Sequence, residues 1–238
     1  MEGKFIVFEG TDGCGKTTVL NHTAKALEAF TDLKIFKTRE PGGLSVAEDI
    51  RGITKNNSLS RIQQTLLFMA SMSINISNSI KPKLDDGYIV ICDRWLRSTY
   101  IYQGFYKQDK EIFNILSKWA CEELLPDFEI VLDADPDICW ERINSRTGVK
   151  LDSTESNGKA FMDNINFQYK NTFGIINGWD YPQKKIITTT MPMRDIVNYS
   201  IEYILDFLGF ELPKALAYDI TKEYEDCIDG KWFGKWFS

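Results

Sequence analysis

The segment at residues 10–18 has the residue types and the spacing of a loop that binds phosphate groups. Its glycines let backbone N–H groups turn toward an anion, while a lysine and a hydroxyl can reach phosphate oxygens and Mg²⁺. We therefore predict a nucleoside triphosphate site, with Lys16 as a catalytic residue and Thr17 as a metal ligand. The residues expected to hold the nucleotide are Gly10, Thr11, Asp12, Gly13, Cys14, Gly15, Lys16, Thr17 and Thr18.

A second reactive pair, Asp93 and Arg94, directly follows the apolar run YIVIC at residues 88–92. A residue at the carboxyl end of a buried strand lies in the crevice where α/β proteins bind ligands. We expect Asp93 to hold Mg²⁺ or its water shell, and Arg94 to neutralise phosphate with its bidentate fork. The alternative for Asp93 is that it only caps the helix that follows.

The scaffold that must position these residues is visible as apolar runs that alternate with segments of helical spacing. We expect strands at residues 5–8, 34–37, 88–92, 129–132 and 185–188. Helices are expected at residues 17–30, 44–53, 63–80, 111–125, 136–145, 161–173 and 193–208, the third of them ending near Pro82. This alternation predicts an α/β fold in which a parallel β-sheet is flanked by helices on both faces.

The composition excludes several other classes of protein. A net charge of −6 argues against an extended basic face, so we expect no nucleic-acid partner. Five scattered cysteines without a CxxC pair indicate reduced thiols, and one histidine leaves no metal-ligand spacing. No signal peptide and no run of roughly 20 apolar residues is found, so we expect a cytoplasmic protein without membrane contact.

Three blocks of the chain, placed in order, resemble the thymidylate kinase family. They are FEGTDGCGKTT at residues 8–18, TREPGG at residues 38–43 with Ala47, Glu48 and Arg51, and DR at 93–94 with ST at 98–99 and YQG at 102–104. The resemblance covers roughly residues 5–209. It implies a P-loop nucleoside monophosphate kinase that uses Mg²⁺ and ATP to phosphorylate deoxythymidine monophosphate (dTMP), with a short lid at about residues 142–160.

The resemblance also implies roles for individual residues. Arg94 would hold the acceptor phosphate, Asp12 would approach the acceptor sugar and phosphate, and Phe68 would stack on the pyrimidine. Tyr102 would disfavour a 2′-hydroxyl, and Gln103 would bond the base edge. Further acceptor contacts are expected from Arg39, Arg51, Ser98 and Thr99. Because the loop has no arginine after Asp12, the catalytic arginines would come from the lid: Arg142 and Arg146, with Lys150 as a further candidate.

Two positions depart from the family pattern. Met72 stands where the family usually has an arginine that contacts the base, and a thioether cannot donate a hydrogen bond. The acceptor could therefore be dUMP or a 5-modified dUMP, and Arg97 is a candidate to compensate. Ser153 also replaces a lid arginine, which reduces the lid charge.

Other functions remain as alternatives. A regulatory P-loop NTPase is one, although a GTPase would need an Asn-Lys-x-Asp motif that the sequence lacks. A catalytically silent relative and a deoxynucleoside kinase are others; arginines on the acceptor side favour a phosphorylated acceptor. We expect a kinase domain at residues 1–209, an aromatic-rich extension at 210–238, and a homodimer, as is common in the family.

Overall fold

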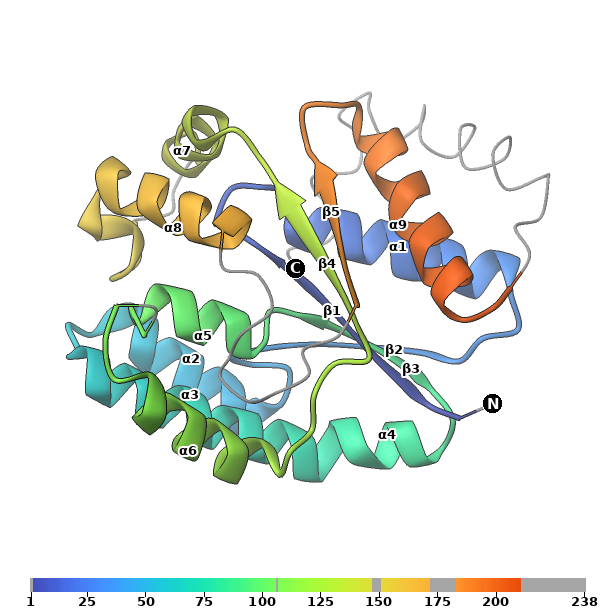
Figure 1. Ribbon diagram of the computed structural model, residues 1–238, viewed down its shortest axis with the longest axis horizontal. Helices are drawn as coiled ribbons and strands as arrows, with labels where there is room; N and C mark the ends of the chain where they lie inside the picture. Colours follow the sequence, from blue (N-terminus) through green and yellow to red (C-terminus); the bar gives the residue numbers. More distant parts are fainter. Residues whose placement is uncertain (1, 106, 147–150, 172–182, 211–238) are drawn as a thin grey trace.

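The computed structural model describes residues 2–105, 107–146, 151–171 and 183–210. A parallel five-stranded sheet runs through the molecule in the order β2-β3-β1-β4-β5 (Figure 1). Its strands are β1 (Lys4–Gly10), β2 (Ile35–Arg39), β3 (Ile89–Asp93), β4 (Phe128–Asp133) and β5 (Gln183–Thr188). All five expected strands are thus confirmed, and the central strand β1 ends at the phosphate-binding loop.

Helices cover both faces of this sheet because successive residues of the buried strands point to opposite sides. On β1, Ile6 and Phe8 pack with α1 (Lys16–Phe30) and α9 (Met193–Phe207). Phe5 and Val7 pack on the other face, where the helices between residues 61 and 171 contribute most of the buried side chains. The α/β fold with a doubly covered parallel sheet is therefore confirmed.

The helices on this second side of the sheet carry most of the residues expected to contact the acceptor. They are α2 (Ser45–Asn56), α3 (Arg61–Asn75), α5 (Leu96–Tyr102), α6 (Lys110–Cys121) and α8 (Lys159–Asn171). Helix α7 (Pro136–Asn144) buries Cys139 in the cluster of α1 and α9. The sequence pattern missed α5, which is only seven residues long and buries six of them, so it has no polar face to reveal its period. A single 3-10 turn, Glu155–Asn157, precedes α8.

The predicted helix at residues 63–80 does not end near Pro82. It continues from α3 through a π-helical turn, Ile76–Ile80, into α4 (Lys81–Asp85). Pro82 lies in the first turn of α4, directly after the π-helical turn. The expectation that the helix ends at this proline was wrong, because the π-helical turn before Pro82 lets the helix continue to Asp85.

In the described part of the chain, no helix is both long and apolar enough to cross a membrane. Of the aromatic-rich extension expected at residues 210–238, residues 211–238 lie outside the described residues, as do Lys150 and the neighbouring lid residues 147–149.

Candidate active site

The phosphate-binding loop connects β1 to α1 with the backbone geometry that an anion site needs. Gly10, Gly13 and Gly15 have φ values of 145°, 83° and 90°, in the region that favours glycine. A Cβ on Gly13 would lie 2.4 Å from the carbonyl oxygen of Cys139, so no side chain fits there. Helix α1 begins directly after the loop, and its amino end contributes unpaired N–H groups and a positive dipole.

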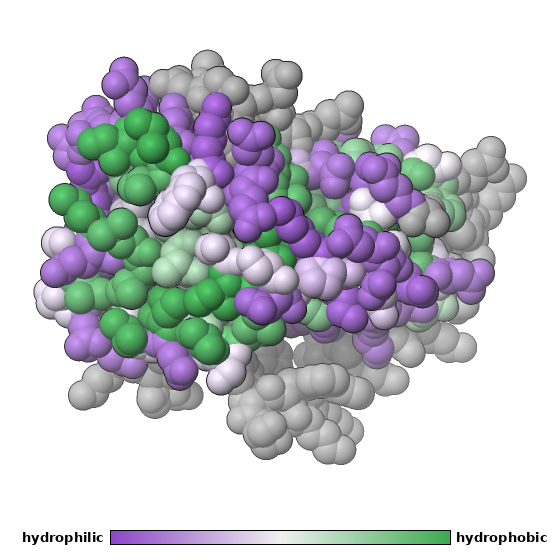
Figure 2. Space-filling model, turned by 90° about the horizontal axis from the view of Figure 1, so that it is seen from below, coloured by the Kyte–Doolittle hydropathy of each residue, from purple (hydrophilic) through white to green (hydrophobic). Residues whose placement is uncertain are grey.

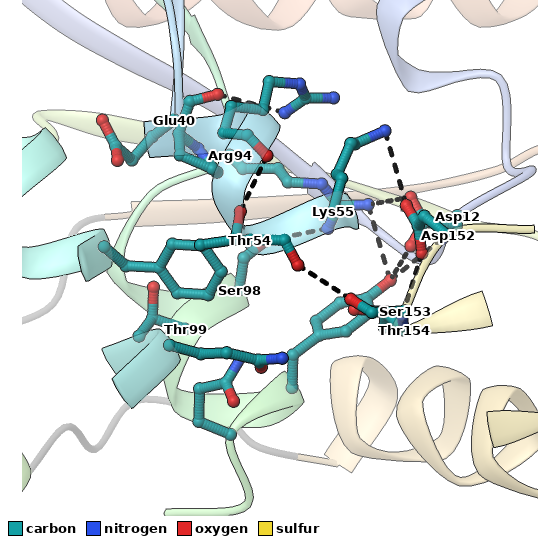
Figure 3. A pocket seen from close by; sticks show the side chains of 16 residues that line it. Asp12, Glu40, Thr54, Lys55, Arg94, Ser98, Thr99, Asp152, Ser153 and Thr154 are labelled. Atoms are coloured by element: carbon teal, nitrogen blue, oxygen red, sulfur yellow. Dashed lines mark hydrogen bonds and ion pairs between the residues drawn. The ribbon is translucent and has the colours of Figure 1, made fainter. Parts of the chain in front are cut away.

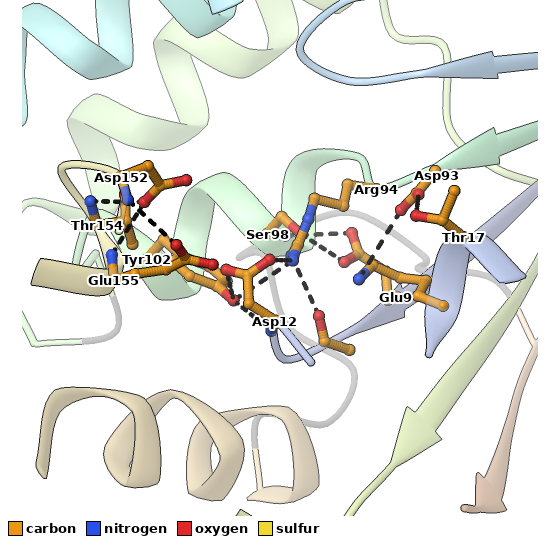
Figure 4. A network of polar contacts seen from close by, with 12 residues as sticks. Glu9, Asp12, Thr17, Asp93, Arg94, Ser98, Tyr102, Asp152, Thr154 and Glu155 are labelled. Carbon is orange, nitrogen blue, oxygen red and sulfur yellow. Dashed lines mark hydrogen bonds and ion pairs between the residues drawn. The ribbon is translucent and has the colours of Figure 1, made fainter. Parts of the chain in front are cut away.

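Oxygen ligands suited to a magnesium ion gather where this loop meets the end of β3. The hydroxyl of Thr17 donates to Oδ2 of Asp93 at 2.5 Å, and Nζ of Lys16 lies 3.8 Å from Oδ1 (Figure 4). Oδ1 itself is buried and accepts no hydrogen bond from the described residues. Mg²⁺ prefers one or two such protein oxygens together with water and substrate phosphates. Thr17 and Asp93 therefore fit the ion.

Arg94 is the centre of the acceptor side. Its backbone adopts a φ of 74°, which is strained for a residue with a side chain. Its Nη1 donates to the Gly10 carbonyl, the Ser98 hydroxyl and the Tyr169 hydroxyl at 2.9–3.1 Å. Its Nη2 donates to Asp12 at 2.6 Å (Figure 4). The guanidinium is thus fixed between the phosphate-binding loop and α5.

Asp12 lies beside this arginine and remains ionised. Burial alone would raise the pKa of Asp12, but the charges of Arg94 and Lys16 and a hydrogen bond from Tyr102 outweigh it and hold the pKa well below its usual range. A fixed negative charge next to Arg94 prevents that cation from turning away. Asp12 therefore orients Arg94.

Two residues of this network, Glu9 and Tyr169, were not assigned a role from the sequence. Glu9 is fully buried at the end of β1 and accepts from the backbone N–H of Trp95 and Ser98 and from the Ser98 hydroxyl. Tyr169, on α8, contacts Arg94, Ser98 and Glu9 through its hydroxyl. Glu9 belongs to the FEG motif and could have been noticed; Tyr169 lies in no quoted motif.

A cavity of about 100 Å³ opens beside Arg94 and Asp12 (Figure 3). Eight residues predicted to bind substrate line it: Asp12, Arg51, Phe68, Arg94, Ser98, Thr99, Tyr102 and Gln103. It is also lined by Glu40, Pro41, Thr54, Lys55, Gln64, Asp152, Ser153 and Thr154. Residues from four distant parts of the chain thus meet around one space next to the phosphate-binding loop.

The segment at residues 152–154 closes this cavity from the lid side. The Ser153 hydroxyl donates to the Thr54 carbonyl at 2.8 Å, and Lys55 pairs with Asp152 at 3.4 Å (Figure 3). These two contacts hold the segment against α2 beside the cavity.

Some expected residues lie apart from this cavity. Arg39 pairs with Glu48 at 2.5 Å and does not line it. Arg142 donates to the Gly13 carbonyl, and Arg146 pairs with Glu155 at 2.6 Å, so both stand on the lid side of the loop. Arg97 makes a buried ion pair with Glu129 at 2.7 Å, so it does not compensate for the missing arginine at the base.

Met72 is fully buried, with its sulfur 3.8 Å from Cys121 Sγ, and it does not line the cavity. Met72 therefore presents no group to the cavity.

The thymidylate kinase family model matches residues 8–196, which include the phosphate-binding loop, the Arg94 network and the cavity. The chain belongs to the thymidylate kinase family. It is therefore related to phosphotransferases that act on nucleotides, and the resemblance seen in the sequence is confirmed.

Individual thymidylate kinases support this assignment. The enzyme of Enterococcus faecalis is 35% identical over 173 residues, covering 71% of this chain and 82% of the relative. One from Prochlorococcus marinus strain NATL1A is 37% identical over 180 residues, covering 71% and 83%. Another from strain AS9601 is 33% identical over 215 residues, covering 87% and 97%.

Proposed function

We propose that this protein transfers the γ-phosphoryl group of ATP to dTMP, giving dTDP and ADP. The observation that carries the proposal is the position of Arg94, which joins the phosphate-binding loop to the acceptor cavity through Gly10 and Asp12. An acceptor phosphate in this cavity faces a fixed cation and lies beside the loop that holds the donor. In-line transfer depends chiefly on such positioning and charge stabilisation.

Each side of the site has a defined part in this reaction. An oxygen of the dTMP phosphate attacks the γ-phosphorus, and the bond to the bridging oxygen of ADP breaks. Lys16 and the loop N–H groups hold the donor phosphates, while Arg94 holds the acceptor phosphate. Mg²⁺, held by Thr17 and Asp93, would supply charge neutralisation at the donor phosphates. Arg142 and Arg146 are proposed to approach the transferred group when the lid closes.

The cavity also favours a deoxypyrimidine. The Phe68 ring lines it as a surface for the base, and Gln103 offers both a donor and an acceptor to the base edge. The Tyr102 hydroxyl is held by Asp12 at 2.9 Å, so its ring is fixed on the sugar side and leaves little room for a 2′-hydroxyl. Arg51, anchored by the Pro41 carbonyl at 3.0 Å, adds a second cation.

The proposal is tested by ADP formation from ATP and Mg²⁺ with dTMP, dUMP, 5-hydroxymethyl-dUMP and dCMP as acceptors. We expect dTMP to be a good acceptor, and Lys16→Ala to abolish turnover with every acceptor while the protein stays folded by circular dichroism. If turnover is highest with dUMP or a modified dUMP, the kinase reaction is supported and the proposed acceptor, dTMP, is wrong. ATP consumption that no acceptor stimulates would overturn the kinase assignment and favour a regulatory NTPase.

We further propose that the protein forms a homodimer. Five large apolar side chains on α3 and α6 are exposed, with Trp119 at 82%. These helices pack against each other, and the side of the molecule that they form has a broad hydrophobic area (Figure 2). The residues are Ile62, Leu66, Ile112, Ile115 and Trp119. A patch of this kind on a kinase that acts in the cytoplasm, as we propose, would associate with a second copy.

Sedimentation velocity tests the dimer. Wild type is expected to sediment as twice the chain mass of 27.4 kDa, and Trp119→Asp as a monomer. Wild type that stays monomeric at high concentration would rule the dimer out.

A further inference from the structure

Glu40 is a buried carboxyl in which one oxygen accepts a hydrogen bond and the other has no hydrogen-bond partner among the described residues. It follows β2, is 2% exposed, and lines the acceptor cavity. Its Oε2 accepts from the Asn75 side-chain amide at 2.6 Å. Its Oε1 is buried without a hydrogen-bond partner among the described residues, and the nearby Ser71 hydroxyl is likewise without a well-formed bond. Orphaned buried polar groups cost free energy unless a ligand satisfies them.

Among the described residues, no lysine or arginine forms an ion pair with Glu40. Burial raises the pKa of Glu40 to about 8, while the nearby Ser71 hydroxyl, the hydrogen bond from Asn75 and the charge of Arg51 lower it only in part. Glu48 of α2 faces it with a like charge. The thiols of Cys92 on β3 and Cys121 on α6 also lie within its field, and burial keeps both protonated. The carboxyl is therefore mostly protonated at neutral pH.

The hydrogen bond from Asn75 then determines which oxygen carries the proton. Because the amide N–H donates to Oε2, that oxygen is the carbonyl-like acceptor, and the hydroxyl proton belongs on Oε1. The free group of Glu40 is therefore a donor. A donor of this kind matches a carbonyl oxygen and does not match an amino group.

The position of Glu40 in the cavity identifies which part of the acceptor would meet this donor. In Figure 3, Glu40 and Thr99 lie on one side of the cavity, and Asp12 and Asp152 lie on the other. Asp12 binds Arg94, so the acceptor phosphate belongs at the Asp12 side. The pyrimidine then extends toward Glu40, and the ring atom farthest from the sugar is C4, which carries an oxygen in thymine and uracil.

We propose that Glu40 is the specificity-determining residue for the base and donates a hydrogen bond from Oε1 to the 4-oxygen of the pyrimidine. This proposal rests on the proposed function, because it concerns the same acceptor. It assigns the substrate class as 4-oxo-pyrimidine deoxynucleotides and supplies the base contact that Met72, buried against Cys121, cannot make. It also explains why a carboxyl lines the cavity with one oxygen unpaired.

The test combines a change in the protein with the matching change in the acceptor. KM for the acceptor and for ATP is measured with dTMP and with the analogue that lacks the 4-oxygen. Glu40→Leu is expected to raise KM for dTMP at least tenfold without changing KM for ATP. Glu40→Gln, which keeps a donor, should remain near wild type, and Ser77→Ala, at an exposed position of the continuous helix that carries Asn75, serves as the control with unchanged KM.

The acceptor analogue keeps the test sharp even if Glu40→Leu fails to fold. In wild type, removal of the 4-oxygen should raise KM at least tenfold, and in Glu40→Leu it should have no further effect. An analogue that binds wild type as well as dTMP does would overturn the proposal for Glu40. Such a result is distinct from failure of the proposed function, in which dTMP itself is not phosphorylated.

Discussion

The two ends of the acceptor cavity each carry a carboxyl, and their surroundings push the two in opposite directions. Asp12 lies beside Arg94 and Lys16, whose charges hold its pKa well below the usual range in spite of burial. Glu40 accepts a hydrogen bond from the side-chain amide of Asn75, and burial raises its pKa to about 8. One end is built for charge and the other for neutral hydrogen bonding.

This difference matches the chemistry of a nucleoside monophosphate. Its phosphate is anionic and must be held by a cation that cannot move, whereas its base is neutral and must be read by donors and acceptors. Burying a cation costs less free energy where it pairs with a carboxylate. A carboxyl group that is protonated can be buried where no cation contacts it. The predictions below separate the two ends, beginning with the largest expected effect.

Arg94→Leu should damage the charged end most. Removal of one electrostatic donor from an active site typically costs roughly 10²–10³-fold in rate, and Arg94 also orients Asp12. We expect at least this loss in kcat/KM for dTMP, with KM for ATP nearly unchanged. The control is Lys81→Ala, which breaks an exposed ion pair between α4 and Glu122, the residue that follows α6. Normal turnover by Arg94→Leu would show that the acceptor phosphate binds elsewhere.

The raised pKa of Glu40 should make the free energy of unfolding depend on pH. The pKa of Glu40 in the folded protein, about 8, exceeds the ordinary value of 4.5. The stability linked to its proton is fully present below the ordinary value and is lost as pH rises toward about 8. Relative to Glu40→Gln, the free energy of unfolding of wild type should fall by up to about 1.4 kcal/mol per pH unit between pH 5 and 8. Urea titrations measure it, and parallel curves for the two proteins would contradict the raised pKa.

Tyr169→Phe should weaken the charged end without removing its charge. The substitution deletes hydrogen bonds to Arg94 and Glu9 and leaves the ring in place. Each such bond contributes about 1 kcal/mol, so KM for dTMP should rise about tenfold. Tyr199→Phe, on the exposed side of α9, is the matched control. If both variants behave as wild type, Tyr169 does not position Arg94.

The lid arginines should give the smallest effects. Arg142 and Arg146 are exposed and paired with the Gly13 carbonyl and with Glu155. Solvent screens such charges, so each alanine variant should lose only a few-fold in kcat. Pre-steady-state phosphoryl transfer measures this directly. Unchanged transfer rates in both variants would show that neither arginine approaches the transferred group.

The sequence predicted the parts of the molecule that follow from local pattern. Buried strands gave continuous apolar runs, and the phosphate-binding loop gave glycines beside Lys16 and Thr17, so both were found at nearly their true positions. Helix α5 was missed because it is buried on almost every side. The stop near Pro82 was wrong because a π-helical turn lets the chain continue.

The candidate site was predictable where residues sit in one motif and unpredictable where distant segments meet. Arg94, Ser98 and Tyr102 come from one stretch, and all three line the cavity. Tyr169 reaches Arg94 from 75 residues away, which no spacing reveals. Whether Glu40 is charged depends on its burial and on the absence of a contacting cation, which only the packing around it determines.

The most direct test of a charged end facing a phosphate is to compare dTMP with thymidine as acceptors for the wild-type protein. The two ligands share the base and the sugar and differ only in the group that Arg94 is expected to hold. Our account predicts that dTMP is phosphorylated with a kcat/KM at least 100-fold above that of thymidine, in line with a charged end that contributes roughly 3 kcal/mol or more. Equal or faster turnover of thymidine would contradict it and make the protein a deoxynucleoside kinase.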